Sequence, residues 1–105
     1  MDKSSFSIEF LAKKFGFSLF ERGFSNSIFR ELAPYETIDI QETHGAVLGL
    51  VLTGDLLINM PDNMQIYCES EEFFLPPNVF FQATAGENGV KLLIAHQFKH
   101  ASMIY

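Results

Sequence analysis

The sequence predicts an all-β domain, an antiparallel sandwich or small barrel preceded by a short N-terminal helix or arm. Three observations predict this class. From residue 27 onward, short segments rich in β-branched and aromatic residues recur at nearly regular spacing. Glycine, proline and asparagine fall between these segments, where turns need them. Finally, 48% of the 105 residues are hydrophobic and 19% are charged, a composition typical of a globular domain with one core.

The first 16 residues are expected to form an arm or helix outside the barrel. The segment IEFLAKKF contains good helix formers, and Gly16 follows it where a helix cap is expected, so a short helix is predicted over residues 7–15. The alternation of apolar residues from Phe6 to Phe10 is the pattern of a strand, which stays the alternative for this segment. Residues 17–100 would then form the barrel, and the 105 residues would make a single domain.

Seven or eight short strands are expected after the N-terminal segment. Their ranges are 27–32, 37–43, 46–52, 56–60, 64–69, 72–75, 79–85 and 90–98. Turns are expected between them, among others at residues 53–55, 61–63 and 86–89, which contain Gly, Pro, Asn or Asp. A further turn is expected at Pro76-Pro77, because neither proline has an N–H to donate within a sheet.

The charge and the hydropathy pattern exclude two classes of partner. The net charge is −6, whereas nucleic-acid-binding domains need a basic face. The phrase LAKKFGFS is similar to the first helix of helix-turn-helix domains, but Gly23 would break the recognition helix that must follow. An acidic surface also disfavours anionic membranes, and glycines interrupt the apolar run over residues 45–60 before it could span a bilayer. We therefore expect no nucleic-acid and no membrane partner.

A cytoplasmic location is expected. The single Cys68 cannot form an internal disulfide and fits a reducing compartment. The N-terminus MDKSSFSIEF lacks the long apolar stretch that follows the basic start of a signal peptide.

A group of residues in the middle of the chain follows a known spacing. Tyr35 is followed after five residues by Gln41, and then come Thr43, Val47 and Gly54. This order resembles the first motif of the cupin superfamily of small double-sheet jelly rolls, G(X)5HXH(X)3–4E(X)6G. Tyr35 and Gly54 take the places of the two glycines in this alignment. Gln41 and Thr43 take the places of the histidines, and Val47 that of the glutamate. The phrase LAPYETIDIQ is also similar to the usual lead-in to this motif.

A second group of residues has the spacing of the second cupin motif, G(X)5PXG(X)2H(X)3N. Pro76 takes the place of the proline, and Ser70 and Asn78 those of the two glycines. Phe81 stands at the histidine and Ala85 at the asparagine. The phrase VKLLIA is similar to the family's usual closing strand. The resemblance covers about residues 28–98 and implies a cupin-like antiparallel double-sheet jelly roll.

The resemblance also implies the loss of a metal centre. In the family, three histidines and one glutamate hold iron, manganese, zinc or nickel, and all four are substituted here, by Gln41, Thr43, Val47 and Phe81. Such ions require imidazole and carboxylate donors. No metal and no other cofactor is therefore expected, and metal-dependent oxygenase, isomerase and decarboxylase activities lose support. Metal-free members of the family include sugar epimerases, storage proteins and the sensor domains of sugar-responsive regulators.

Strand alternation predicts which side chains face the barrel interior. If Gln41 points inward, Asp39 shares its face and Ile38 points outward. The same alternation on the last strand turns His96 inward. The residues expected to line a ligand-binding cavity are Gln41, Thr43, Val47, Val51, Phe81, His96 and Phe98.

The strand expected over residues 46–52 is apolar on both faces. Val47, Gly49 and Val51 would face the interior, and the leucines between them would face outward. A strand that is apolar on both sides in so small a domain needs a cover on its outer face. We expect this cover to be either a second copy of the chain, giving a homodimer through a sheet face, or the N-terminal segment of the same chain.

Three functions are compatible with this pattern. The first, which we favour, is a non-catalytic module that binds a small apolar or amphipathic molecule in a largely apolar cavity, oriented by Gln41, Thr43 and His96. The second is a metal-free isomerase or lyase with His96 or Asp39 as the base. The third is a structural or dimerisation protein whose barrel is packed shut by phenylalanine. No residue is assigned a catalytic role.

Overall fold

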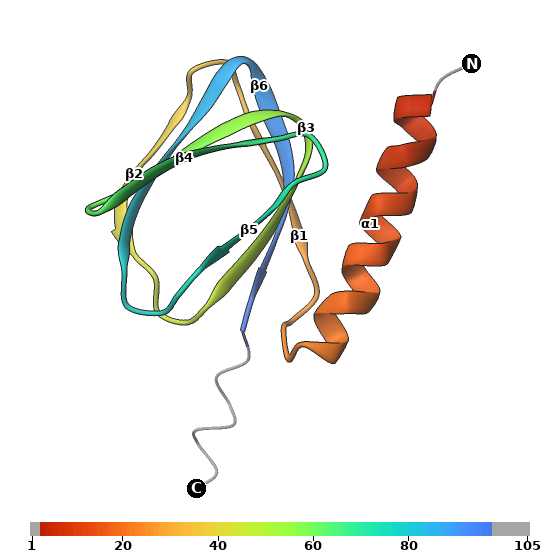
Figure 1. The fold of residues 1–105 in the computed structure, drawn as a ribbon, viewed down its shortest axis with the longest axis horizontal. Helices are drawn as coiled ribbons and strands as arrows, with labels where there is room; N and C mark the ends of the chain where they lie inside the picture. The colour runs from red at the N-terminus through yellow and green to blue at the C-terminus, as the bar shows by residue number, and fades with distance from the viewer. Residues whose placement is uncertain (1–2, 98–105) are drawn as a thin grey trace, which may run out of the picture.

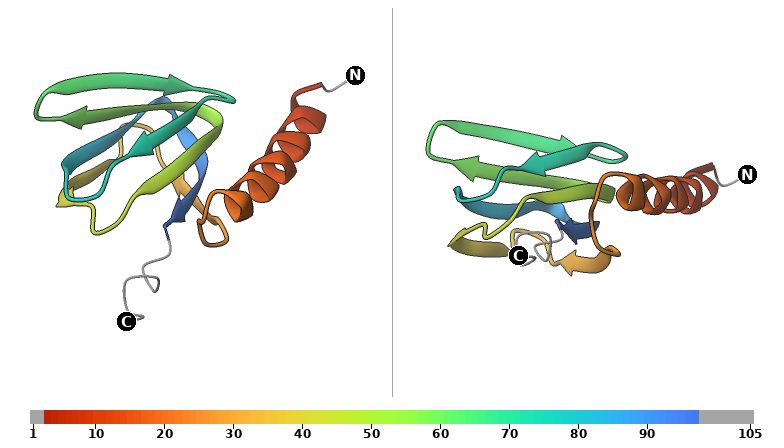
Figure 2. Two further views of the ribbon diagram at one scale, coloured as in Figure 1. Left: turned by 60° about the horizontal axis from the view of Figure 1, so that its bottom comes forward. Right: turned by 90° about the horizontal axis from the view of Figure 1, so that it is seen from below.

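The computed structural model describes the backbone of residues 3–97 and the side chains of residues 8–97. In this part of the chain, one helix precedes six strands that all pair antiparallel (Figure 1). The elements are α1 (Lys3–Glu21), β1 (Ile28–Leu32), β2 (Thr37–Glu42), β3 (Val47–Met60), β4 (Asn63–Cys68), β5 (Glu72–Leu75) and β6 (Phe80–His96). The strands curl around a common interior, and α1 lies beside the barrel (Figures 1 and 2). The predicted all-β jelly roll with an N-terminal helix is confirmed.

The barrel consists of two layers that share the long strands β3 and β6. The first half of β3 pairs with β5 and with the last part of β6, which in turn pairs with β1. The second half of β3 pairs with β4 and with the first part of β6, which pairs with β2. We call the group β1-β6-β3-β5 the first layer and the group β2-β6-β3-β4 the second layer.

The prediction of turns at residues 53–55 and 86–89 was wrong, because β3 and β6 continue through both segments. Gly54 has a φ of +83°, and the register of β3 against β6 shifts on both sides of it, which marks a β-bulge. Gly89 on β6 has a φ of +76°. At this corner the two strands bend from one layer into the other instead of reversing. The described chain therefore has six strands in place of seven or eight.

The glycines of this corner are required for space as well as for conformation. A Cβ atom on Gly54 would overlap the carbonyl oxygen of Gly89, and a Cβ atom on Gly89 would lie 2.7 Å from the carbonyl oxygen of Leu32. Residues with a Cβ atom also adopt positive φ at a cost that glycine avoids. The close approach of β3, β6 and the end of β1 thus depends on both glycines.

The four glycine positions of the two cupin-like motifs share one backbone conformation. Tyr35, Gly54, Ser70 and Asn78 have φ values of +64°, +83°, +73° and +62°, all in the left-handed region. Three of them are not glycine, and no other non-glycine residue in the described chain has a positive φ. This geometry is the one for which glycine is best suited. The backbone therefore supports the alignment of both motifs at all four positions.

Helix α1 is longer than the sequence predicted. It covers Lys3–Glu21, whereas residues 7–15 were expected, and it passes through Gly16 without a break. Residues 17–21, which were assigned to the barrel, belong to this helix. No helix in the described part of the chain is long and apolar enough to cross a membrane.

The glycine that caps the end of the helix is Gly23 and not Gly16. Gly23 has a φ of +81°, and its N–H donates to the carbonyl oxygen of Phe20 at 3.4 Å. The N–H of Phe24 donates to the carbonyl oxygen of Leu19 at 2.9 Å, and both side chains are buried in one cluster. This pair of hydrogen bonds with its apolar contact is a Schellman motif, which ends a helix at a left-handed glycine.

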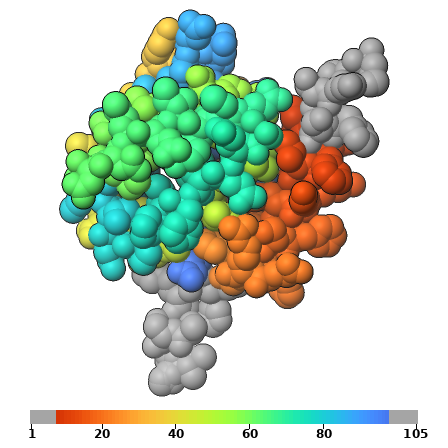
Figure 3. Space-filling model, viewed as in Figure 1, coloured from red at the N-terminus to blue at the C-terminus, as the bar shows by residue number. Residues whose placement is uncertain are grey.

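Helix α1 covers the outer face of the first layer within the same chain. Its inward side chains Phe15 and Leu19 are each 2% exposed and belong to one buried cluster with Leu48 and Leu50 of β3 and Ala95 of β6. The space-filling view shows the side chains of α1 lying directly against the barrel (Figure 3). Of the two covers expected for the outer face of the apolar strand β3, the structure therefore shows the N-terminal segment of the same chain. Self-association stays a prediction, without the support that an uncovered face would have given it.

Candidate functional site

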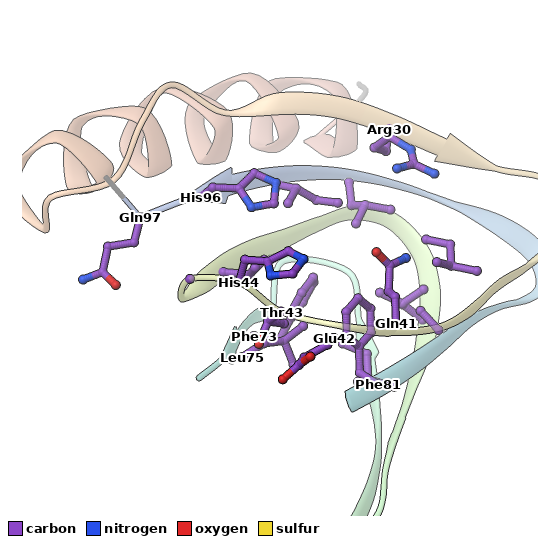
Figure 4. A pocket seen from close by; sticks show the side chains of 18 of the residues that line it. Arg30, Gln41, Glu42, Thr43, His44, Phe73, Leu75, Phe81, His96 and Gln97 are labelled. Atoms are coloured by element: carbon purple, nitrogen blue, oxygen red, sulfur yellow. The ribbon is translucent and has the colours of Figure 1, made fainter. Parts of the chain in front are cut away.

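A pocket of about 540 Å³ lies between the two layers (Figure 4). Apolar side chains from both layers form most of its wall: Leu32, Ile38, Val47, Leu56, Ile58, Phe73, Leu75, Phe81, Ala83, Leu92 and Ile94. The polar side chains that line it are Arg30, Gln41, Glu42, Thr43, His44, His96 and Gln97. The barrel is therefore open, and the hypothesis of a barrel packed shut by phenylalanine was wrong.

Most of the side chains that the sequence assigned to the cavity line this pocket. They are Gln41, Thr43, Val47, Phe81 and His96. Val51 is fully buried in the core between the layers but does not line the pocket. Phe98 lies outside the described residues.

The four positions that hold the metal in cupins meet in this pocket. Gln41, Thr43, Val47 and Phe81 come from different elements, and all four line it. They do not fit a metal ion of the kind that the family binds, because Val47 and Phe81 carry no donor atom. In the part of the chain that the structure describes, no three His, Cys, Asp or Glu side chains gather closely enough to hold an ion. These side chains therefore offer no equivalent of the 3-His-1-Glu centre.

The hydroxyl of Thr43 holds the double-proline turn between β5 and β6. Its Oγ1 donates a hydrogen bond to the carbonyl oxygen of Pro76 at 2.7 Å and accepts one from the N–H of Val79 at 3.0 Å. The backbone of Thr43 also accepts from Asn78 N–H and donates to the Val79 carbonyl oxygen, both at 2.9 Å. Thr43 is 4% exposed. Its hydroxyl hydrogen is thus used within the turn, and the role of Thr43 in orienting a ligand stays a prediction.

Thr43→Val is expected to lower the free energy of unfolding by about 1–3 kcal/mol, because it removes both side-chain hydrogen bonds from a partly buried turn. Urea unfolding followed by circular dichroism measures this loss. Thr37→Val is the control, since it removes an exposed hydrogen bond to Thr84 and should cost only about 0.5 kcal/mol. Equal stability losses in the two variants would contradict the anchoring role of Thr43.

A β-bulge in β2 changes which side chains face the pocket. The register of β2 against β6 shifts between Ile38 and Gln41, and both of these residues line the pocket. Because the extra residue of a bulge resets the alternation, the predicted orientations of Ile38 and Asp39 were wrong. Asp39 is exposed and does not line the pocket. It is therefore not placed to act there as a base.

The phenylalanines on either side of the double proline alternate between the two faces of their layers. Phe73 and Phe81 line the pocket, whereas Phe74 and Phe80 are 53% and 52% exposed. The ring of Phe73 lies so close to Gly49 that a Cβ atom there would overlap it. Phe81 is only half-buried and leaves the pocket open.

Sequence reasoning missed four polar residues of the pocket, Arg30, Glu42, His44 and Gln97. Arg30 pairs with Leu92 across β1 and β6, and both line the pocket. The alternation in the strand IFREL could have placed Arg30 on the same face as the apolar Leu32. His44 is exposed, as expected for a turn, yet it lines the pocket on the same side as His96 (Figure 4).

The fold is shared with solved structures at low sequence identity. No protein-family model and no curated protein sequence matches the chain. A cupin superfamily protein from Desulfitobacterium hafniense is 22% identical, with a TM-score of 0.61 over 68% of this chain and 64% of its own. The cupin domain of Cnp3 from Schizosaccharomyces pombe is 14% identical, with a TM-score of 0.68 over 78% of this chain and 61% of its own. A DMSP lyase is 15% identical, with a TM-score of 0.64 over 70% of this chain and 38% of its own.

The matched region spans less than two thirds of each of these three proteins. At such identities the likeness concerns the fold, and it agrees with the two shared strands, the bulged corner and the left-handed motif positions described above. The chain thus has the fold of the cupin superfamily, and Gln41, Thr43, Val47 and Phe81 stand at the positions aligned with the family's metal ligands.

Proposed function

We propose that this protein binds a small, largely apolar or amphipathic molecule between the two layers of its barrel, without a metal ion and without catalysis. The observation that carries the proposal is the pocket of about 540 Å³ with apolar walls from both layers. Pockets of this size, with mostly apolar walls and a few polar groups, are typical of small-molecule sites. Removal of apolar ligand surface from water would supply most of the affinity, and the polar side chains would set the orientation.

Several of the polar side chains of the pocket suit orientation better than acid–base catalysis. A catalytic base must lie within hydrogen-bond reach of the proton that it takes. Asp39 lies outside the pocket, and the hydroxyl hydrogen of Thr43 is used within the turn. Gln41 carries an amide and Arg30 a guanidinium, and neither is among the side chains that commonly serve as a general base. These features support a binding role.

A metal-free isomerase or lyase is the second candidate function, and one observation favours it. His44 and His96 line the same side of the pocket, so one imidazole could take a proton from a substrate while the other returns it (Figure 4). Turnover that is lost in His96→Gln while ligand binding is kept would favour this function over the binding role.

A screen of small apolar and amphipathic molecules by thermal shift, in the presence of a metal chelator, is expected to find ligands. A ligand that binds only the folded state raises its stability by mass action. At ten times its Kd the gain is about 1.4 kcal/mol, which raises the Tm of a domain of this size by about 6 °C. The absence of any ligand in such a screen would contradict the proposal.

Two tryptophan variants test whether such ligands occupy the pocket. Ile94→Trp places an indole in the pocket wall and is expected to abolish the thermal shift of each ligand. Ile66→Trp is the matched control, because Ile66 is 57% exposed on β4 and does not line the pocket. A shift that survives in Ile94→Trp and disappears in Ile66→Trp would locate the binding site outside the pocket.

A further inference from the structure

We propose further, on the basis of the binding function above, that the ligand is a small amphipathic carboxylic acid whose carboxylate pairs with Arg30. The proposal depends on the position of Arg30 beside the pocket, on the absence of an anionic partner for it among the described residues, and on the apolar character of the rest of the pocket wall.

Arg30 lies on the cavity side of β1. Leu32, on the same face two residues further, is 3% exposed and lines the pocket, while Glu31 between them does not. Across the sheet, Arg30 is opposite Leu92, which also lines the pocket. Figure 4 shows Arg30 extending from β1 over the pocket. The guanidinium of Arg30 therefore lies beside a wall that is otherwise mostly apolar.

Arg30 has no anionic partner among the described residues. The one ion pair in that part of the chain joins Arg22 to Glu72 at 3.4 Å. The carboxylate that lines the pocket is that of Glu42, and Figure 4 shows it directed away from Arg30. A guanidinium offers parallel N–H groups that match the two oxygens of a carboxylate. Among the described residues no carboxylate pairs with these donors, so they can bind a ligand.

The sign of this charge and the apolar wall together define the ligand class. A cationic head group would be repelled by Arg30, and a neutral one would leave the guanidinium without a counter-charge. Gln41 points toward the same part of the pocket, and its amide N–H groups can donate to a carboxylate oxygen (Figure 4). The apolar body of the acid would lie against side chains such as Leu92, Ile94 and Phe73. The overall charge of −6 cannot attract an anion, so the local charge of Arg30 must do so.

Matched acids and amides separate the charge of the ligand from its apolar body. Hexanoate, octanoate and 4-phenylbutyrate are each compared with the corresponding primary amide, which has nearly the same shape and no charge. Dissociation constants are measured by isothermal titration calorimetry at low ionic strength with a chelator present. The wild-type protein is expected to bind each acid about tenfold more tightly than its amide. A bidentate hydrogen-bonded pair between a guanidinium and a carboxylate is stronger than a hydrogen bond from the guanidinium to a neutral amide.

Two arginine variants identify the residue responsible. Arg30→Gln is expected to bind each acid no more tightly than its amide, so that the roughly tenfold preference disappears. Arg22→Gln is the control, because Arg22 does not line the pocket and is already paired with Glu72. It should keep the full preference for acids. Because Arg30 is exposed, the Tm of Arg30→Gln should stay close to that of the wild type.

The outcomes distinguish this proposal from the binding function on which it rests. Equal binding of acids and amides by the wild-type protein would overturn the role of Arg30 and leave the binding function standing. Binding of neither member of any pair would overturn both. A preference for acids that persists in Arg30→Gln and disappears in Arg22→Gln would also overturn the proposal, because it would locate the anion site outside the pocket.

Discussion

Gly54→Ala is expected to lower the free energy of unfolding by about 2–5 kcal/mol, a large effect for one added methyl group. Two causes add. The φ of +83° at Gly54 costs about 1–2 kcal/mol for a residue with a Cβ atom. The new Cβ atom would also overlap the carbonyl oxygen of Gly89, and this backbone atom cannot rotate away as a side chain could. Forcing the strands apart adds about 1–3 kcal/mol.

Two other glycines separate these causes. Gly23 has a φ of +81° but no atom within 4 Å of an added Cβ, so Gly23→Ala should show only the conformational cost of about 1–2 kcal/mol. Gly16 lies inside α1 with open space around it, so Gly16→Ala should stabilise the protein by about 1 kcal/mol. Urea unfolding measures all three. If Gly54→Ala were no worse than Gly23→Ala, the close approach of β3 and β6 at the corner would be wrong.

Phe15→Ala is expected to lower the free energy of unfolding by about 3–5 kcal/mol. Phe15 is 2% exposed and packs in the cluster that joins α1 to the leucines on the outer face of β3. Removing the ring leaves a cavity between the helix and the first layer, and this cavity adds to the lost burial of apolar surface. The effect would show that the helix is an integral part of the domain.

Phe17→Ala is the matched control for this prediction. Phe17 lies two residues further along the same helix and is 77% exposed, so its truncation should change stability by no more than about 0.5 kcal/mol. Thermal or urea unfolding compares the two variants. Equally small effects would mean that α1 does not cover the first layer, and the apolar face of β3 would again need a second copy of the chain.

The strands could be predicted from the sequence wherever the pattern is local. The strands β1, β2, β4 and β5 lie within about one residue of their predicted ranges. The long strands could not be recognised, because a left-handed glycine has the same sequence signal in a bulge as in a turn. What distinguishes the two at Gly54 is its pairing with Val90, far along the chain. The sequence also does not distinguish a glycine inside a helix from one that caps it. Gly16 lies inside α1, whereas Gly23 has the positive φ and the hydrogen bonds of the cap.

The candidate site was partly predictable because the motif spacing fixes the turns. The alignment brought Gln41, Val47 and Phe81 to the pocket although their side chains differ from the family's ligands. The errors arose where the backbone departs from regular alternation, as in the bulge that turns Ile38 inward and leaves Asp39 outside. Arg30 was missed because no motif includes its strand. Its place in the pocket depends on the pairing of β1 with β6.

The interior of the barrel is expected to bind a small amphipathic molecule without a metal ion. Isoleucine methyl groups test this expectation directly, because Ile38, Ile58 and Ile94 line the pocket while Ile40 and Ile66 are exposed and do not. The measurement is a titration of methyl-labelled protein with 4-phenylbutyrate in the presence of a chelator, followed by NMR. We predict saturable chemical-shift changes at the three pocket methyl groups and none at the two exposed ones. Changes confined to the exposed methyl groups, or no saturable change at any of the five, would contradict this expectation.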